Sequence, residues 1–506
     1  MPDAALFSVS DKTGAAELAR ALAARGSAIF ATGGTCGFLR DNGVATRDVE
    51  ELTGFPPLFD GRVKTLHPKV FGAILYDRDD AAHRQQASQY AIAPLGTVVV
   101  NLYPLGGEID VGGVALLRAA AKNFAHVSVL SDPSQYSEFL AQLESGGPSR
   151  AQRRKLAIAA FRRVAEYDAA IARSLEGQDA QDGSELPGAL TVAMPLAQPL
   201  RYGENPQLRA AFYLGNRRIL PEQLHGKALS YNNLLDLDAT LRLLSRAALG
   251  AEFGSQRERY ARAAIVKHTV PCGVAQRSSV SKAIAMALAA DPISAYGGIL
   301  AVDRTIDRAG ADELAPFFLE IVAAPAFGDE ALERLRRKKN LRVMRYAPEL
   351  PDELQRGLQL RSALGGVLAE EEDPQFARES WHVASARQPL PQEWHDLALA
   401  WDVVRHVKSN GVVIASDGVT RGICAGQTNR VSAVQIAADR AATFANGAAC
   451  ASDGFFPFAD GLEAAAAAGC SAIIAPSGSI RDPEVIAAAD RLGVSLVFSS
   501  HRYFLH

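Results

Sequence analysis

Apolar runs typical of β-strands alternate with helical patterns along the first part of the chain. The pattern predicts strands at 5–9, 28–31, 97–102 and 127–130, and helices at 15–24, 111–122 and 150–175. Such alternation is typical of βαβ units built on a parallel sheet. The rest of the chain again mixes helices with short buried strands, such as 264–266 and 412–415. We therefore expect an α/β protein.

A polar stretch rich in Gly and Asp, EGQDAQDGSELPG, interrupts this pattern from Glu176 onward. We interpret 176–199 as an interdomain linker, with a long surface loop as the alternative. Beyond it lies a weak internal echo between AIVKHTVPCGVA, from Ala264, and HVKSNGVVIA, from His406. The echo fits two similar halves, and a chance match fits it equally well.

Composition narrows the class of protein. The 506 residues hold 53 Lys+Arg against 56 Asp+Glu, a net charge of −3, which provides no general field for nucleic acid or an anionic membrane. The chain shows no basic leader and no apolar run of about 18 residues, so we expect neither a signal peptide nor a membrane span. Five scattered cysteines without CxxC spacing predict reduced thiols in a cytoplasmic protein.

Two strand-to-helix turns, Ser10-Asp11-Lys12-Thr13-Gly14 and Thr32-Gly33-Gly34-Thr35, could hold an anion. Backbone N–H groups and helix N-termini favour phosphate there, and Lys12 would add a point charge. Ordinary helix capping by Ser10, Asp11 and Thr32 is the alternative. Neither turn matches G-x-x-x-x-G-K-[ST] or G-x-G-x-x-G, which disfavours triphosphate and dinucleotide sites.

Further candidates follow in the same domain. Arg62-Val63-Lys64-Thr65 opens a basic segment that is either a shaped anion site or a surface loop, and Asn101-Leu102-Tyr103 follows an apolar strand where ligands often bind. Asp110 precedes the helix that carries Lys122. In one straight helix the two would lie about 18 Å apart, so they share a small site only if the helix starts late or bends. A ligand as long as a nucleotide could alternatively touch both.

In the second domain Lys267 and His268 follow a short apolar run. A neutral imidazole can accept a proton while an ammonium group steadies an oxyanion, although an exposed Lys beside a packed His is the commoner arrangement. Zinc deaminase chemistry needs H-x-E and P-C-x-x-C. Val270 and Ala275 stand at the required Glu and second Cys, so we expect no zinc site.

Long motifs then resemble a known family. The runs are SVSDKTG, ATGGT, GRVKTLHPKV, VVNLYP, EIDVGG, LLRAAAKN, RYGENP, LSYNNLLDLDA, IVKH with PCG, DPISAYGGILA, HVKSN, ASDGFFPFADG, APSGSIRD and VFSSHRYFLH. They keep their order from end to end. The chain resembles the bifunctional purine biosynthesis family that joins a formyltransferase to an IMP cyclohydrolase.

This resemblance implies a fold and two reactions. It implies a methylglyoxal-synthase-like parallel-sheet domain at 1–178, a linker at 179–198, and a transformylase domain of two cytidine-deaminase-like layers at 199–506. The second domain would transfer the formyl group of 10-formyltetrahydrofolate to AICAR, giving FAICAR, and the first would close FAICAR to IMP. The family is homodimeric, and its transformylase sites are assembled across the subunit interface without a catalytic metal.

The resemblance also implies roles for individual residues. Lys122 matches the cyclohydrolase proton donor/acceptor, with Lys64, Tyr103 and Asp110 around it, and further ligand contacts match Ser10, Asp11, Lys12, Thr32, Gly33, Gly34, Thr35, Arg62, Val63, Thr65, Asn101, Leu102, Val111 and Gly112. His268 matches the transformylase base and Lys267 its transition-state stabiliser. The AICAR contacts match Arg201, Tyr202, Gly297, Glu320, Asn410, Arg430 and Arg502, and the folate contacts match Val431, Phe455, Asp460, Ser479 and Ile480.

The chain departs from the family pattern at four places. Gln207 and Leu208 replace the His-Gln of RYGENPHQ, and Val270 replaces an Asn beside His268. Phe71 stands where His is common, and the segment between Pro104 and Asp110 is short. Because the missing His normally lies near the transferred formyl group, an alternative is a cyclohydrolase with a weakened transformylase domain.

Overall fold

A computed structural model describes residues 3–59, 62–104, 108–179, 186, 188–215, 220–245, 259–372 and 378–506. The chain forms two compact units, Met1–Met194 and Pro195–His506. The division between them falls inside the segment 179–198. Residues 180–185 and 187 of that segment lie outside the described residues.

The first unit is built on a five-stranded sheet of order β3-β2-β1-β4-β5. Every neighbouring pair runs parallel, which confirms the predicted parallel sheet. The strands are β1 (Ala4–Val9), β2 (Ile29–Ala31), β3 (Thr46–Asp48), β4 (Leu95–Asn101) and β5 (Ser128–Leu130). The edge strand β3 was missed because three residues, one of them buried, show no periodicity.

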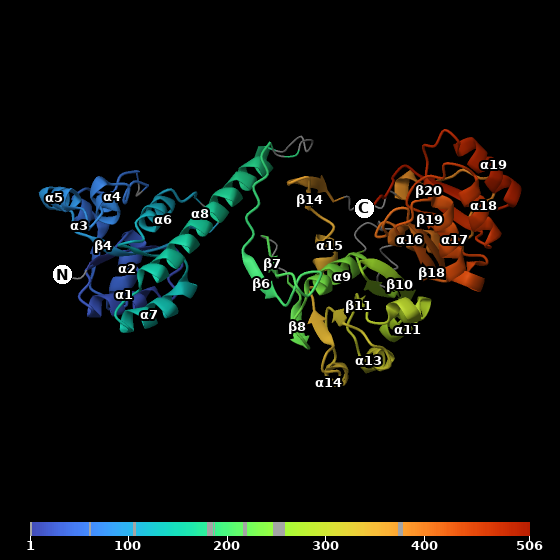
Figure 1. The fold of residues 1–506 in the computed structure, drawn as a ribbon, viewed down its shortest axis with the longest axis horizontal. Helices are drawn as coiled ribbons and strands as arrows, with labels where there is room; N and C mark the ends of the chain where they lie inside the picture. The colour runs from blue at the N-terminus through green and yellow to red at the C-terminus, as the bar shows by residue number, and fades with distance from the viewer. Residues whose placement is uncertain are drawn as a thin grey trace. The chain divides into compact units, whose positions relative to one another are not determined.

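Helices cover both faces of this sheet (Figure 1). One face packs on α1 (Ala15–Ala24), α2 (Gly33–Asp41) and α7 (Tyr136–Glu144). The other packs on α4 (Pro68–Leu75), α6 (Gly112–Lys122) and α8 (Arg150–Asp179). Shorter elements are α3 (Val49–Thr53), α5 (Ala81–Gln89) and η2 (Pro133–Gln135). Helix α8 continues four residues beyond the predicted end at 175, because Glu, Gln and even one Gly are tolerated in a helix.

A twelve-stranded sheet organises the second unit, with order β16-β21-β20-β19-β17-β18-β10-β9-β11-β12-β13-β8. Its strands are β8 (Glu222–His225), β9 (Ala261–Lys267), β10 (Val270–Arg277), β11 (Ile299–Val302), β12 (Ile321–Ala324), β13 (Arg342–Arg345), β16 (His382–Val383), β17 (Val412–Ser416), β18 (Val419–Cys424), β19 (Ala449–Ser452), β20 (Ala472–Pro476) and β21 (Ser495–Ser499). Two separate ribbons pair β6 (Leu196–Leu200) with β7 (Ala210–Tyr213), and β14 (Leu358–Ala363) with β15 (Gly366–Glu371).

Three apolar cores hold this sheet. One lies under α11 (Val280–Ala290), α13 (Arg308–Leu314) and α14 (Asp329–Arg336), and a second under α17 (Arg430–Ala441), α18 (Asp460–Ala467) and α19 (Asp482–Leu492). The third lies under α9 (Tyr231–Arg242) and α16 (Pro391–Val404) and contains side chains from strands in both halves of the sheet. The remaining helices are α12 (Pro292–Ala295), α15 (Leu350–Glu353), η4 (Arg378–Ser380) and η5 (Ala442–Ala445).

The second unit repeats one topology. A hairpin followed by three further strands, β9-β10-β11-β12-β13, recurs as β17-β18-β19-β20-β21, and the two hairpins meet at β10 and β18. Each hairpin needs a glycine under its first helix: a Cβ would lie 2.2 Å from the Ala287 carbonyl oxygen at Gly273, and 1.9 Å from that of Ala437 at Gly422. The expected two similar halves are therefore present.

The lysines that suggested the repeat are not equivalent. Lys267 ends β9, the first strand of its hairpin, whereas Lys408 lies before β17, the first strand of the other hairpin. The prediction of two similar halves is thus supported by the strand order, but the two lysines on which it was based do not correspond. Topology repeats here, but the side chains at the strand ends do not.

Two further expectations concern the oxidation state of the cysteines and the presence of membrane-spanning helices. All five cysteines are free, four of them buried and Cys272 partly buried. Within the described part of the chain, no helix combines the length and apolar character that crossing a bilayer requires.

Two candidate active sites

The first candidate site begins where β1 and β4 end side by side. Val9 and Asn101 are partners in the parallel register, so the residues after β1 reach the Asn101 side chain. Its amide oxygen accepts hydrogen bonds from the backbone N–H of Ser10 (2.5 Å) and Asp11 (2.8 Å), and its NH₂ group donates to the Asp11 carbonyl (2.8 Å). Asn101 therefore fixes the first predicted phosphate turn.

Lys12 points back into this edge of the sheet. Its ammonium group donates to the Val9 carbonyl and to the Thr35 hydroxyl, the latter at 3.3 Å. Burial lowers the pKa of Lys12, because the charged form loses hydration. An anion beside this ammonium group would favour the charged form. Lys12 thus joins the two predicted turns, 10–14 and 32–35.

The second turn presents an open helix N-terminus. Thr32 occupies the cap position of α2, but its side chain makes no capping bond and instead donates to the Ser8 hydroxyl at 3.2 Å. Outside its chain neighbours and its own helix backbone, no atom of the described residues lies within 4 Å of the position of a Cβ on Gly34. The capping alternative therefore fails for Thr32. The N–H groups of Thr35 and Cys36 donate to the Thr32 carbonyl, so an anion at this helix terminus would be met by the N–H groups of Gly33 and Gly34.

Lys64 lies against the same helix terminus. A Cβ placed on Gly33 would be 3.0 Å from the Lys64 Nζ, and one placed on Gly112 would be 3.0 Å from the Thr65 hydroxyl. The basic segment 62–65 therefore passes between the N-termini of α2 and α6. Lys64 is half-buried and Thr65 buried, while Arg62 and Val63 are exposed and Arg62 reaches Glu108 at 3.5 Å.

Asp110 caps α6 at this edge. Its carboxylate accepts a hydrogen bond from the Gly113 N–H (2.7 Å), and its own N–H donates to the Tyr167 hydroxyl of α8 (3.0 Å). Burial raises the pKa of Asp110, and hydrogen bonds from the backbone of Gly113 and Tyr103 oppose that rise. Tyr103 itself is exposed and Leu102 is buried. The structure thus brings Asp110 and Tyr103 together.

Lys122 lies elsewhere. Helix α6 is unbroken from Gly112 to Lys122, and Val111 precedes it as an exposed cap residue. The helix starts two residues after Asp110 and runs on without interruption, so Lys122 stands at its far end, about 15 Å from Gly112 along the axis. Its side chain is exposed. Within one chain Lys122 does not share the pocket of Lys64 and Asp110.

The second candidate site centres on the turn between β9 and β10. Lys267 and Val270 pair across a two-residue loop, His268-Thr269, whose residues both have positive φ, 55° and 61°. The Lys267 ammonium group donates to the Tyr296 carbonyl at 2.7 Å. Both side chains line a cavity of about 520 Å³ that extends along Val270, Cys272, Ile293, Arg421 and Arg440. Neighbouring Lys and His thus face open space, as acid–base chemistry requires.

Two predicted AICAR contacts, Gly297 and Glu320, precede strands on the same side of this turn, and two more, Arg201 and its neighbour Tyr202, lie near Leu229 after β8, four strands from β9. Ile299 of β11 pairs with both Val266 and Ile321, so Gly297 and Glu320 end up beside Lys267. Glu320 forms a 2.6 Å ion pair with the buried Arg342, whose guanidinium also donates to the Ala228 carbonyl. The next residue, Leu229, accepts from the Arg201 N–H, and Arg201 stacks on Tyr202 with 4.5 Å from its guanidinium carbon to the ring centre.

The other predicted contacts gather at the ends of β18, β19, β20 and β21. Arg430 forms an ion pair with the buried Asp453 and donates to Ser452 at 3.0 Å, while both Arg430 and Arg502 lie over the Phe504 ring. Asn410 donates twice to the Gln427 carbonyl. The folate candidates occupy the same edge of the sheet: Val431, Phe455, Asp460, Ser479 and the fully exposed Ile480.

The two groups of transformylase candidates share one sheet edge but do not meet. β10 and β18 separate β9, which carries Lys267, from β17, which follows Asn410. Three strand spacings amount to about 14 Å. One chain therefore supplies the catalytic pair in one place and most cationic ligand contacts in another.

Comparison with known proteins decides the family. Residues 120–440 match the family model of the AICARFT/IMPCHase bienzyme, and residues 14–125 match that of the MGS-like domain. The bifunctional purine biosynthesis protein PurH of Bacillus cereus (strain B4264) is 44% identical over the full length of both chains, and that of Bacillus mycoides (strain KBAB4) is 43% identical, also over both full lengths. Among solved structures, the crystal structure of ForH shares 38% identity with a TM-score of 0.32, covering 34% of this chain and 96% of that one.

The chain belongs to the AICARFT/IMPCHase bienzyme family. It is therefore a purine biosynthesis enzyme with a formyltransferase and a cyclohydrolase activity. The N-terminal sheet is the MGS-like domain of this bienzyme, and the expected α/β architecture is confirmed.

Three contacts at the candidate sites were not predicted from the sequence. Tyr167 holds the Asp110 backbone, Tyr296 holds the Lys267 ammonium group, and Asp236 accepts from the backbone of His268 and Thr269. Each acts through the backbone or over a long sequence separation, which no local spacing reveals. Asp236 lies inside the quoted run LSYNNLLDLDA, yet nothing in that run singled it out.

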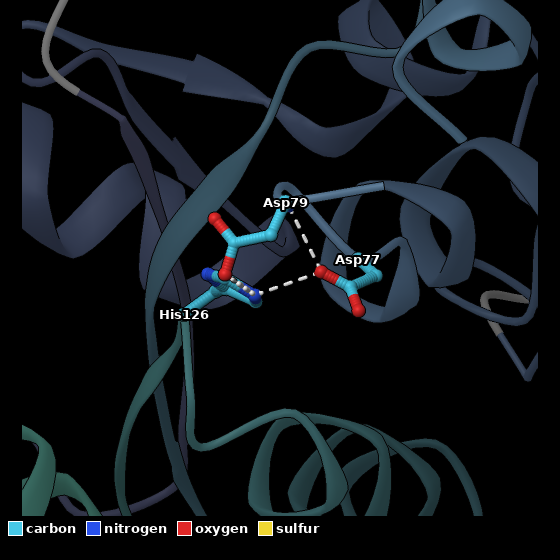
Figure 2. Close-up of side chains that lie close together, drawn as sticks. All are labelled: Asp77, Asp79 and His126. Carbon is cyan, nitrogen blue, oxygen red and sulfur yellow. Dashed lines mark hydrogen bonds and ion pairs between the residues drawn. The ribbon is translucent and has the colours of Figure 1, made fainter. Parts of the chain in front are cut away.

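Among the described residues, one group of side chains that could ligate a metal ion lies away from both sites. Asp77, Asp79 and His126 each offer an atom within 4.8 Å of the others, and Figure 2 shows both carboxylates beside the ring. His126 Nε2 contacts Asp77 at 3.1 Å and Asp79 at 3.8 Å. Both carboxylates are exposed. In the second unit, burial raises the pKa of Cys272 to about 12.

Proposed function

We propose that this bienzyme catalyses the last two steps of IMP formation. The C-terminal domain, 199–506, transfers a formyl group from 10-formyltetrahydrofolate to AICAR, and the N-terminal domain, 1–178, closes the product FAICAR to IMP. The observation that carries the proposal is the full-length similarity to bifunctional PurH proteins. The geometry of both candidate sites supports it.

FAICAR would bind the first site by its phosphate. Turns 10–14 and 32–35 offer backbone N–H groups, the open N-terminus of α2 and the ammonium group of Lys12. Lys64, at the same helix terminus, would then polarise the formyl oxygen of the substrate. The further proposed contacts, from Arg62 to Thr65 and from Asp110 to Gly112, enclose the same space.

Ring closure needs one bond formed and one water lost. The carboxamide nitrogen attacks the formyl carbon, the carbonyl electron pair moves to oxygen, and a nitrogen proton is lost. The oxyanion takes up one proton to give a hydroxyl, which takes up a second proton and leaves as water, while the other nitrogen on this carbon loses its proton and the C=N bond forms. Asp110 suits this proton transfer because burial raises its pKa, and Tyr103 lies beside it.

Lys122 remains our proposed proton donor/acceptor on the strength of the family motif. Its position at the far end of α6 requires either a ligand that extends along the helix or a second copy of the chain that delivers Lys122. Lys64 lies at the phosphate end of the site and needs neither arrangement. Variants at Lys64 and at Lys122 therefore test the two lysines separately.

Formyl transfer would use the turn of the second unit. His268 removes the proton of the AICAR amine as its nitrogen attacks the formyl carbon, and Lys267 stabilises the developing oxyanion. The bond from the formyl carbon to N10 then breaks, and tetrahydrofolate leaves with a proton. The amine needs this help because its electrons delocalise into the imidazole ring of AICAR.

We also propose a homodimer. The separation of about 14 Å between Lys267 and Asn410 favours a site that combines the catalytic turn of one chain with Asn410, Arg430 and Arg502 of another. Folate would occupy the edge formed by Val431, Phe455, Asp460, Ser479 and Ile480. Analytical ultracentrifugation of the full chain tests the dimer.

The two half-reactions are assayed apart. Supplied FAICAR should be closed to IMP, and AICAR with 10-formyltetrahydrofolate should give FAICAR. A specific observation favours the weaker alternative: Gln207 is exposed, in a turn closed by the hydrogen bond from the Gly203 N–H to the Leu208 carbonyl. If transfer is slow while closure is fast, Gln207→His should raise transfer. Failure of both half-reactions contradicts the proposed function.

A further inference from the structure

The turn that carries the catalytic pair is strained. Two-residue hairpin loops of this kind place both residues at positive φ and usually use Asn and Gly. Here the positions hold His268 (φ 55°) and Thr269 (φ 61°). A β-branched residue in this region is an outlier that persists only when its surroundings hold it. Something must therefore fix this loop.

Asp236 supplies that hold. One carboxylate oxygen accepts the His268 N–H at 3.2 Å, and the other accepts the Thr269 N–H at 2.7 Å. These are consecutive N–H groups that face away from the hairpin ladder. Charged acceptors make the stronger backbone hydrogen bonds, so a single carboxylate clamps both strained residues.

Helix α9 makes the carboxylate a rigid partner. The helix starts in a reciprocal capping box between Ser230 and Asn233, and it buries Leu237 and Leu241 against the central core. The Thr240 hydroxyl donates to the Asp236 carbonyl at 2.5 Å. Asp236, 32 residues before His268, therefore connects the catalytic turn to the core of the domain.

Lys267 is held from the opposite side. Its ammonium group donates to the Tyr296 carbonyl, in the loop between α12 and β11. With the backbone of His268 and Thr269 fixed by Asp236, both catalytic side chains leave the hairpin from set positions. Neither of these two contacts occupies the imidazole of His268, which stays exposed for the substrate.

We propose that Asp236 is a positioning residue for formyl transfer, whose carboxylate fixes the left-handed turn from which Lys267 and His268 act. This inference rests on the proposed transformylase function. Asp236 does not touch the substrate. It acts by keeping the imidazole nitrogen at attack distance from the amine, where an error of about 1 Å costs about 100-fold in rate.

The test uses the full chain and four proteins: wild type, Asp236→Ala, Asp236→Asn and the matched control Asp238→Asn. Asp238 lies on the same helix but pairs with Arg242 at 2.8 Å. We measure kcat and KM for formyl transfer, AICAR affinity by calorimetry, melting temperature, and FAICAR closure in the other domain.

We expect Asp236→Ala to lower kcat for transfer about 100-fold with AICAR affinity within about threefold of wild type. Asp236→Asn keeps one acceptor oxygen and should retain an intermediate kcat. Asp238→Asn should match wild type, and all variants should close FAICAR normally. This split between kcat and affinity supports positioning.

Two outcomes overturn the inference. Wild-type kcat in Asp236→Ala shows that the turn needs no clamp. A kcat that falls in both Asp236 variants only together with AICAR affinity and melting temperature shows a purely structural role. Failure of the wild-type protein itself to form FAICAR instead overturns the proposed function, so the two failures are distinguishable.

Discussion

The ammonium group of Lys64 lies against the first residue of α2, where a Cβ on Gly33 would stand 3.0 Å from its Nζ. This contact joins a basic loop to the helix terminus at which we place the substrate phosphate. A side chain at position 33 would require the end of the Lys64 side chain to shift, and the φ of Gly33 does not lie in the left-handed region.

Gly33→Ala should displace the Lys64 side chain from the N-terminus of α2. We expect kcat/KM for FAICAR closure to fall about tenfold, since an interaction with a charged group is worth about 1.5 kcal/mol or more. Gly37→Ala in the same helix is the matched control, because among the described residues nothing beyond the helix itself lies within 4 Å of the Cβ it would add. Equal activity in the two variants would contradict the placement of Lys64 in the site.

Asn101→Ala should loosen the first phosphate turn. The substitution removes two hydrogen bonds to the backbone of Ser10 and Asp11 and one to the Asp11 carbonyl. Because these groups position the turn rather than react, we expect KM for FAICAR and the inhibition constant of IMP to rise about tenfold with kcat little changed. A change confined to kcat would show that Asn101 acts on the chemistry instead.

Lys122→Ala tests whether Lys122 takes part in ring closure, as the family motif implies, although it lies far from Asp110 within one chain. If Lys122 moves a proton, closure of FAICAR slows strongly while IMP still binds, because the phosphate turns lie at the other end of α6. Stopped-flow closure assays and IMP titration measure both quantities. Unchanged closure would remove Lys122 from the mechanism and leave the proton transfers to Lys64, Asp110 and Tyr103.

Acid should weaken the C-terminal unit through His406. Loss of hydration and the neighbouring Arg405 guanidinium lower the pKa of His406 to about 3, while Asp402 opposes the shift. The unfolded imidazole, with an ordinary pKa near 6.5, binds its proton first, so stability is lost as pH falls below about 6.5 toward 3. The loss reaches at most about 1.4 kcal/mol per pH unit.

The measurement is urea unfolding followed by tryptophan fluorescence. All three tryptophans, Trp381, Trp394 and Trp401, belong to the C-terminal unit, so the signal reports that unit alone. Between pH 6 and 4, His406→Gln should lose stability less steeply than the wild type. Parallel pH profiles would show that His406 is not the responsible group.

The sequence predicted the N-terminal sheet well because its strands are apolar and each is followed by a helix. It also located the phosphate turns, since Ser, Thr and Gly at strand ends have a local signature. It could not show that Lys64 reaches Gly33 or that Asp110 meets Tyr103, because those contacts depend on how separate loops pack.

Other features depended on tertiary structure altogether. The edge strand β3 is too short to show periodicity, and the carboxylate of Asp236 reaches a turn that is distant in sequence. The repeated halves of the second unit follow from strand order, and the motif that hinted at them paired residues that are not equivalent. The position of Lys122 relative to Asp110 likewise became clear only from the bounds of α6, which runs from Gly112 to Lys122.

The most direct test is whether the purified protein alone converts AICAR to IMP through FAICAR in a single reaction. Purified protein is mixed with AICAR and 10-formyltetrahydrofolate, and FAICAR and IMP are followed by liquid chromatography over time. The account predicts that FAICAR forms first and IMP follows, and that His268→Ala abolishes both products while leaving closure of added FAICAR intact. Absence of IMP from the wild-type reaction at any enzyme concentration would contradict it.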